Sequence, residues 1–185
     1  MQPQSIQQIN LSYDQHQDRL LMRAAVSDEQ EIQVWITYRV ARQIFKVFNQ
    51  EAHLPVSGPL PLSEQSLPEA TQQFVQEAEA VEALDDLDFE TAYQAPKSVV
   101  TEQTLLAVET RFVSVNDQLN HVQLVCANGI NVNINVNHEL VLAISRMLLL
   151  ASKEAGWTLP SAPAKEPQPV SSIVMDIPVE KQVLH

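Results

Sequence analysis

Glycine and cysteine are both scarce in this sequence, and their scarcity excludes several kinds of site. The three glycines, Gly58, Gly129 and Gly156, stand apart from one another, so no phosphate-binding loop of the Rossmann or P-loop type can be written. Cys126 is the only cysteine. A single cysteine excludes an intramolecular disulfide and a zinc site built from several thiolates.

Long apolar runs are also missing. The longest one, within residues 140–152, is interrupted by Arg146 and is too short to span a bilayer. The first residues, Met-Gln-Pro-Gln-Ser, have neither the basic nor the apolar region of a signal peptide. These features predict a cytoplasmic protein with no membrane contact.

Residues suited to catalysis or metal binding are present, but their spacing does not favour either. No His-x-x-x-His pair occurs in the predicted helices. Asp14, His16 and Asp18 alternate across a predicted turn, which is typical of a solvated hairpin tip. The acidic residues from Glu77 to Glu90 lack the spacing of a calcium-binding loop. The sequence therefore predicts a protein that is not an enzyme, with no catalytic residues, metal site or cofactor.

Basic residues are outnumbered, 11 against 23 acidic residues, which gives a net charge of −12. The excess is concentrated in residues 51–100, where ten acidic side chains accompany a single basic one, Lys97. The remainder of the chain is close to neutral. The low overall pI therefore does not by itself exclude a nucleic-acid surface elsewhere.

The clearest pattern is an unbroken alternation of apolar and asparagine residues over 130–137. This period of two is typical of a strand with one buried face. Asn128-Gly129 marks a hairpin before it. A three-residue loop over 127–129 would pair Leu124 with Val132 and keep one face apolar, so we predict that loop, with Gly129 in the left-handed conformation.

A shift of 100 residues aligns this region with an earlier one. Ile32, Val34 and Ile36 then overlie Val132, Ile134 and Val136, and the helical patterns after them also coincide. We predict an α+β fold with two β-β-β-α repeats, antiparallel sheets, and helices packed on the apolar faces. The predicted boundaries are 1–52 and 99–157 for the repeats, which form one compact domain, and 53–98 for the segment between them.

The segment between the repeats begins as a proline-rich linker and then becomes helical. Ser66 and Glu69 form a capping box at the predicted helix start. The apolar residues that follow recur at three- and four-residue spacing, and they are Leu67, Ala70, Phe74, Ala78, Val81 and Leu84. We expect this stripe to be buried on the sheet or on another protein.

Residues 158–185 are rich in proline, alanine and serine, which predicts a disordered tail. The tail contains an apolar, β-prone run at 173–179. Such a run fits addition to a sheet edge.

The polar faces of the strands supply the candidate binding residues. Those of the first repeat are Arg19, Arg23, Gln33 and Trp35, and those of the second are Asn131, Asn133 and Asn135. An aromatic ring beside arginines on an open sheet suits base stacking and phosphate neutralisation. The alternative is that another layer of the protein, or a second subunit, buries Trp35.

The order of elements resembles, in architecture alone, the strand-rich units with a helix found in PUR-type and whirly-type single-strand binders. No motif of those families occurs in this sequence, and a shared fold does not fix function. Our leading hypothesis is a non-enzymatic interaction or adaptor protein whose partner is another protein, first of all a second copy in a homodimer. The alternative is a single-stranded nucleic-acid-binding protein.

Overall fold

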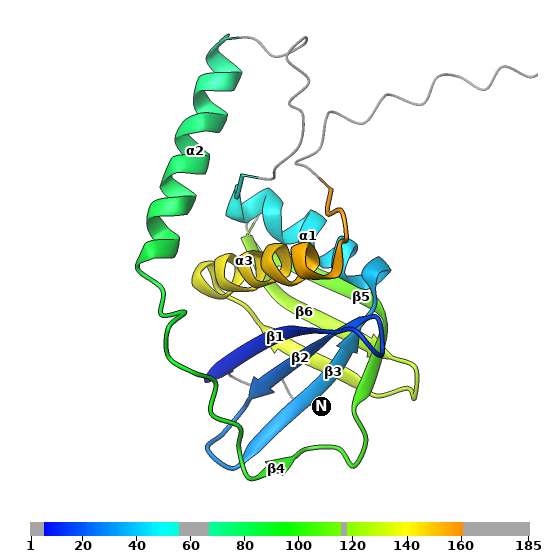
Figure 1. Cartoon of the computed structure of the whole chain (residues 1–185). Helices are drawn as coiled ribbons and strands as arrows, with labels where there is room; N and C mark the ends of the chain where they lie inside the picture. The colour runs from blue at the N-terminus through cyan, green and yellow to red at the C-terminus, as the bar shows by residue number, and fades with distance from the viewer. Residues whose placement is uncertain (1–5, 56–66, 116–117, 161–185) are drawn as a thin grey trace, which may run out of the picture.

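The computed structural model describes residues 6–55, 67–115 and 118–160, which form seven strands and three helices (Figure 1). In chain order these are β1 (Gln8–Asp14), β2 (Arg19–Ala25), β3 (Gln30–Ile36), α1 (Tyr38–Ala52), α2 (Leu67–Asp85), β4 (Ser98–Val99), β5 (Leu105–Val115), β6 (Gln118–Cys126), β7 (Asn131–Asn135) and α3 (His138–Ala155). Ser66 and the predicted β-prone run at 173–179 lie outside the described residues.

The strands form a single mixed sheet that is largely antiparallel. Its order is β1-β2-β3-β5-β6-β7, and β4 pairs with β3. The pairs within β1-β2-β3 and within β5-β6-β7 are antiparallel, whereas β3 runs parallel to both β4 and β5. The predicted α+β class is confirmed. The prediction of antiparallel sheets is wrong at the β3–β5 junction, because the long connection through α1 and α2 lets β5 start beside β3 in the same direction.

The β6–β7 hairpin forms as its sequence predicts. Leu124 pairs with Val132, and the amide of Gly129 donates to the carbonyl of Cys126 at 2.9 Å to close a three-residue loop. Gly129 has a φ of +82°, a conformation that costs glycine little because it has no Cβ. The loop length keeps the apolar residues of both strands on the same face.

Both long helices of the core begin and end at residues suited to capping. The side chains of Thr37 and Asn137 accept hydrogen bonds from the amides of Val40 and Leu140, the third helical residue in each case. Gly156 ends α3 with a φ of +70°, as the sequence predicts.

Helices α1 and α3 lie side by side over the apolar face of the sheet (Figure 1). Side chains at alternate strand positions, among them Val34, Leu124 and Val132, face fully buried helix residues such as Phe45 and Leu142. The sheet also curls, so that Val132 of β7 shares an apolar pocket lining with residues of β2 and β3. The core therefore lies between the helices and the concave face of one curved sheet.

The residues after α3 pack back onto the molecule. The Trp157 ring contacts the Tyr38 and Tyr13 rings, with centroids 5.1 and 6.0 Å apart. The Tyr38 hydroxyl donates to the carbonyl of Thr158 at 2.5 Å, and Leu159 is buried. Thus Thr158 and Leu159, which belong to the tail predicted from the sequence, contribute to the ordered body. In the described part of the chain, none of the helices has the length and apolar character needed to cross a membrane.

Candidate interaction surfaces

The face of the sheet opposite the helices carries the predicted polar residues. Arg23 of β2 pairs with Gln33 of β3, and Leu21 pairs with Trp35. Trp35 is half-buried, and in the described residues α1 and α3 lie on the other face (Figure 1). Arg19 lies at the start of β2, opposite Asp14 of β1. The alternation therefore places these four residues on one face as predicted.

A buried carboxylate lies on this face near the start of β3. Glu31 is only 2% exposed, and it accepts hydrogen bonds from Arg23 Nη2 at 3.3 Å, Gln33 Nε2 at 2.5 Å and the Tyr93 hydroxyl at 2.8 Å. Thr104 extends the network by donating to Gln33 Oε1 at 3.2 Å. We refer to Arg23, Glu31, Gln33, Tyr93 and Thr104 as the carboxylate network.

The network shifts the pKa values of Glu31 and Tyr93, whose oxygen atoms lie 2.8 Å apart. Burial acts to raise the pKa of Glu31, but the hydrogen bonds from Tyr93 and Gln33 and the charge of Arg23 outweigh it and leave that pKa lowered. Burial and the Glu31 carboxylate both raise the pKa of Tyr93. At neutral pH the network therefore holds a charged Glu31 and a neutral Tyr93.

Contacts to β1, β2 and β3 hold the connector, residues 86–104 between α2 and β5, against the sheet. The Arg23 guanidinium lies 5.4 Å from the Tyr93 ring centroid, and the Gln94 amide donates to the Gln8 side chain at 3.2 Å. The Ser98 amide then donates to the carbonyl of Glu29 at 3.0 Å. Of the predicted contact residues, Arg23 and Gln33 are thus engaged within the protein itself.

The asparagines of β7 lie on the same face but at a distance from Trp35. Strands β5 and β6 separate β7 from β3. Asn133 Oδ1 accepts from Gln123 Nε2 at 2.9 Å, and Asn135 Oδ1 lies 3.3 Å from His121 Nδ1. The structure therefore places the two predicted groups on one sheet face without bringing them together.

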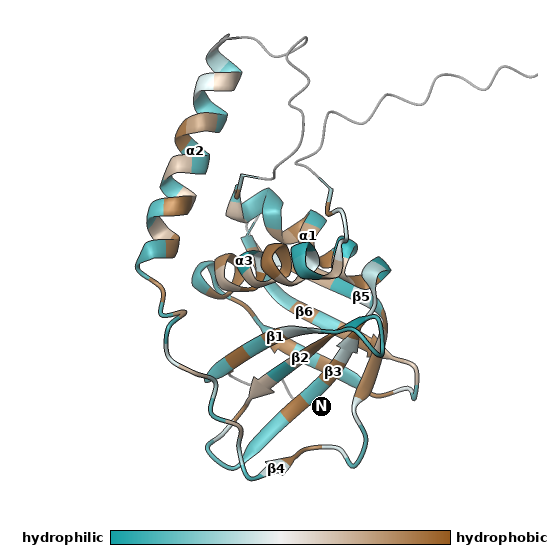
Figure 2. Cartoon of the chain, viewed as in Figure 1, coloured by the Kyte–Doolittle hydropathy of each residue, from teal (hydrophilic) through white to brown (hydrophobic). Residues whose placement is uncertain are grey.

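Helix α2 carries a second surface, on the apolar stripe that the sequence predicts to be buried on the sheet or on another protein. The helix stands beside the body and meets α3 near its C-terminal end (Figure 1). Ala80 is buried there, and Leu84 is partly buried. Phe74 and Val81 of the predicted apolar stripe are instead 71% and 44% exposed, and Figure 2 shows apolar segments along the projecting helix. For these two residues the structure excludes burial on the sheet, which is one of the two predicted positions of the stripe, and burial on another protein stays a prediction.

The reason lies in the angular separation of the two faces of α2. At 100° per residue, Ala80 lies about 120° around the helix from Phe74, whereas Val81 lies within about 20° of it. Because the side of α2 that bears Ala80 faces the core, Phe74, Ala78 and Val81 are turned toward solvent. We call Phe74, Ala78 and Val81 the α2 stripe.

A groove of about 470 Å³ lies where α2 ends. Leu87 and Phe89 of the connector form one side, and Leu140 and Ala143 of α3 contribute to the other. Two acidic residues, Asp88 and Glu139, also line it. Asn135 and Asn137 line it as well, and none of the described lining residues is a lysine, arginine or histidine. The groove is therefore partly apolar and partly polar, with acidic but no basic side chains.

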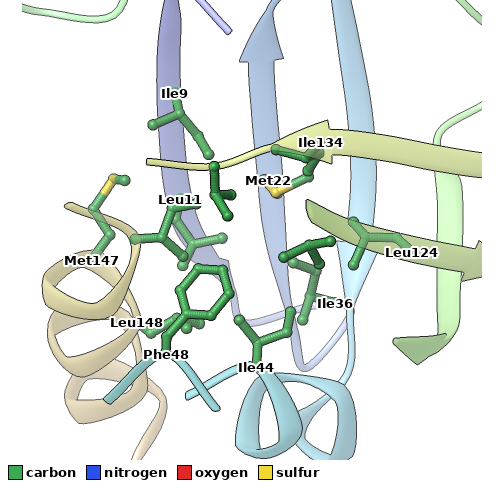
Figure 3. Close-up of a pocket in the computed structure, with 13 residues that line it drawn as sticks. Ile9, Leu11, Met22, Ile36, Ile44, Phe48, Leu124, Ile134, Met147 and Leu148 are labelled. Carbon is green, nitrogen blue, oxygen red and sulfur yellow. The ribbon is translucent and has the colours of Figure 1, made fainter. Parts of the chain in front are cut away.

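A small apolar cavity of about 20 Å³ lies in the core (Figure 3). In the close-up, side chains of the strands and both core helices converge on it, including Leu11, Ile44, Phe48 and Leu124. Such a volume corresponds to about one water-sized sphere. It is a packing defect of the core and has no room for a substrate.

The described residues also show little that suits catalysis. They contain no group of three or more His, Cys, Asp or Glu side chains placed to hold a metal ion. Cys126 is buried in the core, and burial raises the pKa of its thiol. A thiol in that setting is poorly placed to act as a nucleophile.

Sequence reasoning missed three participants in the carboxylate network, Glu31, Tyr93 and Thr104. Glu31 has the same parity as Gln33 and Trp35 along β3, so its place on the polar face could be found from the alternation. Tyr93 lies 62 residues further along the chain, and no local pattern identifies it.

Comparison with family models, with curated proteins and with solved structures found no match to this chain.

Proposed function

We propose that this chain is a non-enzymatic protein-interaction protein that binds its partner through α2. The observation that carries the proposal is the exposure of the α2 stripe on a helix that meets the rest of the protein near one end. Large exposed apolar side chains that lie close together are typical of interaction surfaces. A partner that covered Phe74 alone would remove apolar area corresponding to about 2–3 kcal/mol of transfer free energy.

The projecting part of α2 also favours an outside partner on grounds of helix stability. The described residues from Pro68 to Val75 are exposed or, at Gln73, half-buried. Isolated helices of this length are marginal in water, because most helix stability in proteins comes from tertiary packing. Binding along the α2 stripe would supply that packing.

The test compares the full chain with a double variant that makes the stripe polar, Phe74→Gln with Val81→Gln. Glutamine is a good helix former, so the change removes apolar surface and little helix propensity. Val113→Thr on β5 is the matched control, because Val113 is also about half exposed but lies on the sheet. The measurements are sedimentation velocity over a concentration series and affinity capture with each chain as bait.

We expect self-association or partner capture by the full chain and by Val113→Thr, and loss of both in the stripe variant. A full chain that stays monomeric and recovers the same proteins as the stripe variant would contradict the proposal. Circular dichroism of each variant checks that the fold is retained.

The nucleic-acid alternative is best tested directly on the sheet face. The positive charge of Arg23 is engaged by Glu31, and the exposed Arg111 on β5 pairs with Glu109, so we expect weak attraction for phosphates. Titration of a labelled single-stranded oligonucleotide should give a flat anisotropy at low and at moderate salt. Steeply salt-dependent binding that is lost in Trp35→Ala would replace our proposal with this one.

We further infer that the chain is built from two β-β-β-α repeats offset by 100 residues. The two core helices support this, because α1 and α3 start 100 residues apart, at Tyr38 and His138. Their capping residues, Thr37 and Asn137, have the same offset, and each accepts a hydrogen bond from the amide three residues after it. The β3–β5 pairing would place both repeats in one sheet. Internal alignment of homologous sequences tests the inference, since the same offset should recur, and a different or absent offset would refute it.

A further inference from the structure

We propose that the partner segment is a cationic amphipathic helix that lies along the α2 stripe and reaches the groove at the end of α2. This inference rests on the proposed function, and it adds the chemical class of the partner. It follows from the shape of the apolar surface and from the sign of the charges around it.

The apolar surface is elongated. Phe74 and Val81 are seven residues apart, which is about 10 Å along a helix axis. Two more apolar side chains lie past the end of α2, because Leu87 and Phe89 line the groove with residues of α3, and Phe89 is 44% exposed. A surface several turns long and one side chain wide suits a helix laid beside α2 with its apolar residues at three- and four-residue spacing.

The charges along this surface are of one sign. Glu77, Glu82 and Asp85 lie three or four residues after Phe74, Ala78 and Val81 respectively, so each acid borders a member of the stripe. Asp88 and Glu139 line the groove. Residues 67–90 contain eight acidic and no basic side chains. A partner helix with lysines or arginines beside its apolar stripe would complement these charges, which favours encounter and orientation.

The same charges disfavour a second copy of α2 as the occupant. Two α2 helices packed through their stripes would bring acidic borders together, and like charges at an interface oppose association. We therefore propose a basic partner of different sequence. The homodimer predicted from the sequence is the alternative, and the experiment must distinguish the two.

The experiment uses the full chain and three labelled 18-residue peptides. The probe is a leucine–lysine peptide with an amphipathic helical pattern. The first control peptide replaces every lysine with glutamate, and the second replaces every leucine with serine. Fluorescence anisotropy at low and moderate salt reports binding, and sedimentation velocity of the chain alone reports self-association.

Two variants of the chain locate the binding surface, each with a matched control elsewhere. Phe74→Gln with Val81→Gln removes apolar contacts, and Val113→Thr is its control. Glu82→Gln with Asp85→Asn removes charge from the border, and Asp28→Asn with Glu102→Gln removes the same charge from exposed positions outside α2.

We expect the leucine–lysine peptide to bind, and both control peptides to bind at least tenfold more weakly. Each α2 variant should weaken binding of the probe about tenfold, a size typical of central interface contacts, while the matched controls change it less than twofold. Equal loss in the charge control would indicate nonspecific attraction to an acidic protein and would overturn the proposal. Binding that is unaffected by the stripe variant, or preference for the glutamate peptide, would also overturn it.

Failure of this inference can be told apart from failure of the proposed function. If the probe does not bind but the stripe variant still abolishes self-association or capture, α2 is an interaction surface for a partner of another class. If the stripe variant changes neither probe binding, self-association nor capture, both proposals fail.

Discussion

Replacing Glu31 with glutamine tests whether the carboxylate network stabilises this fold. The substitution keeps the size of the side chain but removes the charge that Arg23 faces at 3.3 Å. Arg23 Nε is already buried without a hydrogen-bond partner among the described residues. Breaking a buried ion pair costs about 3–5 kcal/mol of unfolding free energy. Because the Arg23 side chain is 32% exposed, water compensates part of that, and we expect a loss of about 2–3 kcal/mol.

The assay is urea unfolding followed by tryptophan fluorescence, with a second Arg–Glu pair on the same sheet as control. Arg111 Nε lies 2.9 Å from Glu109 Oε1, but these side chains are 60% and 53% exposed. Exposed pairs contribute little, so Glu109→Gln should change the unfolding free energy by less than about 0.5 kcal/mol. A loss in Glu31→Gln as small as that in Glu109→Gln would refute the reasoning, since burial would then not decide the strength of the pair.

The same comparison gives a pH dependence of defined sign. The folded-state pKa of Glu31 is lowered from its ordinary value of 4.5, so the unfolded chain takes up the proton first as pH falls. The stabilisation is therefore complete above about pH 4.5 and is lost as pH falls through the lowered folded-state pKa. The gap between the wild-type chain and Glu31→Gln should shrink from pH 5 to pH 3. A gap that widens over this range would show the sign to be wrong.

Three further substitutions test the packing and the local conformations. Phe45→Ala, at a fully buried position of α1, should cost about 3–5 kcal/mol and lower the urea midpoint without changing the slope. Asn137→Ala removes the cap that accepts from the Leu140 amide at 2.9 Å and should cost about 1 kcal/mol by the same assay. Gly129→Ala should cost about 1 kcal/mol through its positive φ alone, because a Cβ there meets nothing within 4 Å. An unchanged urea midpoint would contradict each prediction.

The parts of the fold that could be predicted are those specified by neighbouring residues. Gly129 and the alternation after it determine a loop length and a register, and Gly156 ends α3 where predicted. The β3–β5 pairing was not predictable in this way. It joins Val34 to Leu105, and a parallel pair between segments so far apart leaves no turn or spacing in the sequence. The two-residue strand β4 also gives no periodic signal.

The candidate sheet face was predictable in its composition but not in its chemistry. Alternation correctly grouped Arg23, Gln33 and Trp35, because side-chain direction depends only on position along a strand. Whether Arg23 is available to a ligand depends on Glu31 and Tyr93, and the contact with Tyr93 comes from a distant part of the chain. Periodicity predicts which residues share a face, whereas the partners of that face depend on tertiary contacts.

Helix α2 shows the same distinction, and the proposed function rests on it. The spacing of Phe74, Ala78 and Val81 correctly identifies an apolar stripe, but a period does not state which neighbour covers it. In the folded chain the side of α2 that bears Ala80 faces the core, so a small side chain is buried while Phe74 is exposed. Packing within one chain normally covers the larger apolar group, because the transfer free energy grows with buried area. The reversed order on α2 is what an interaction surface requires, since the larger side chain then stays available to a partner.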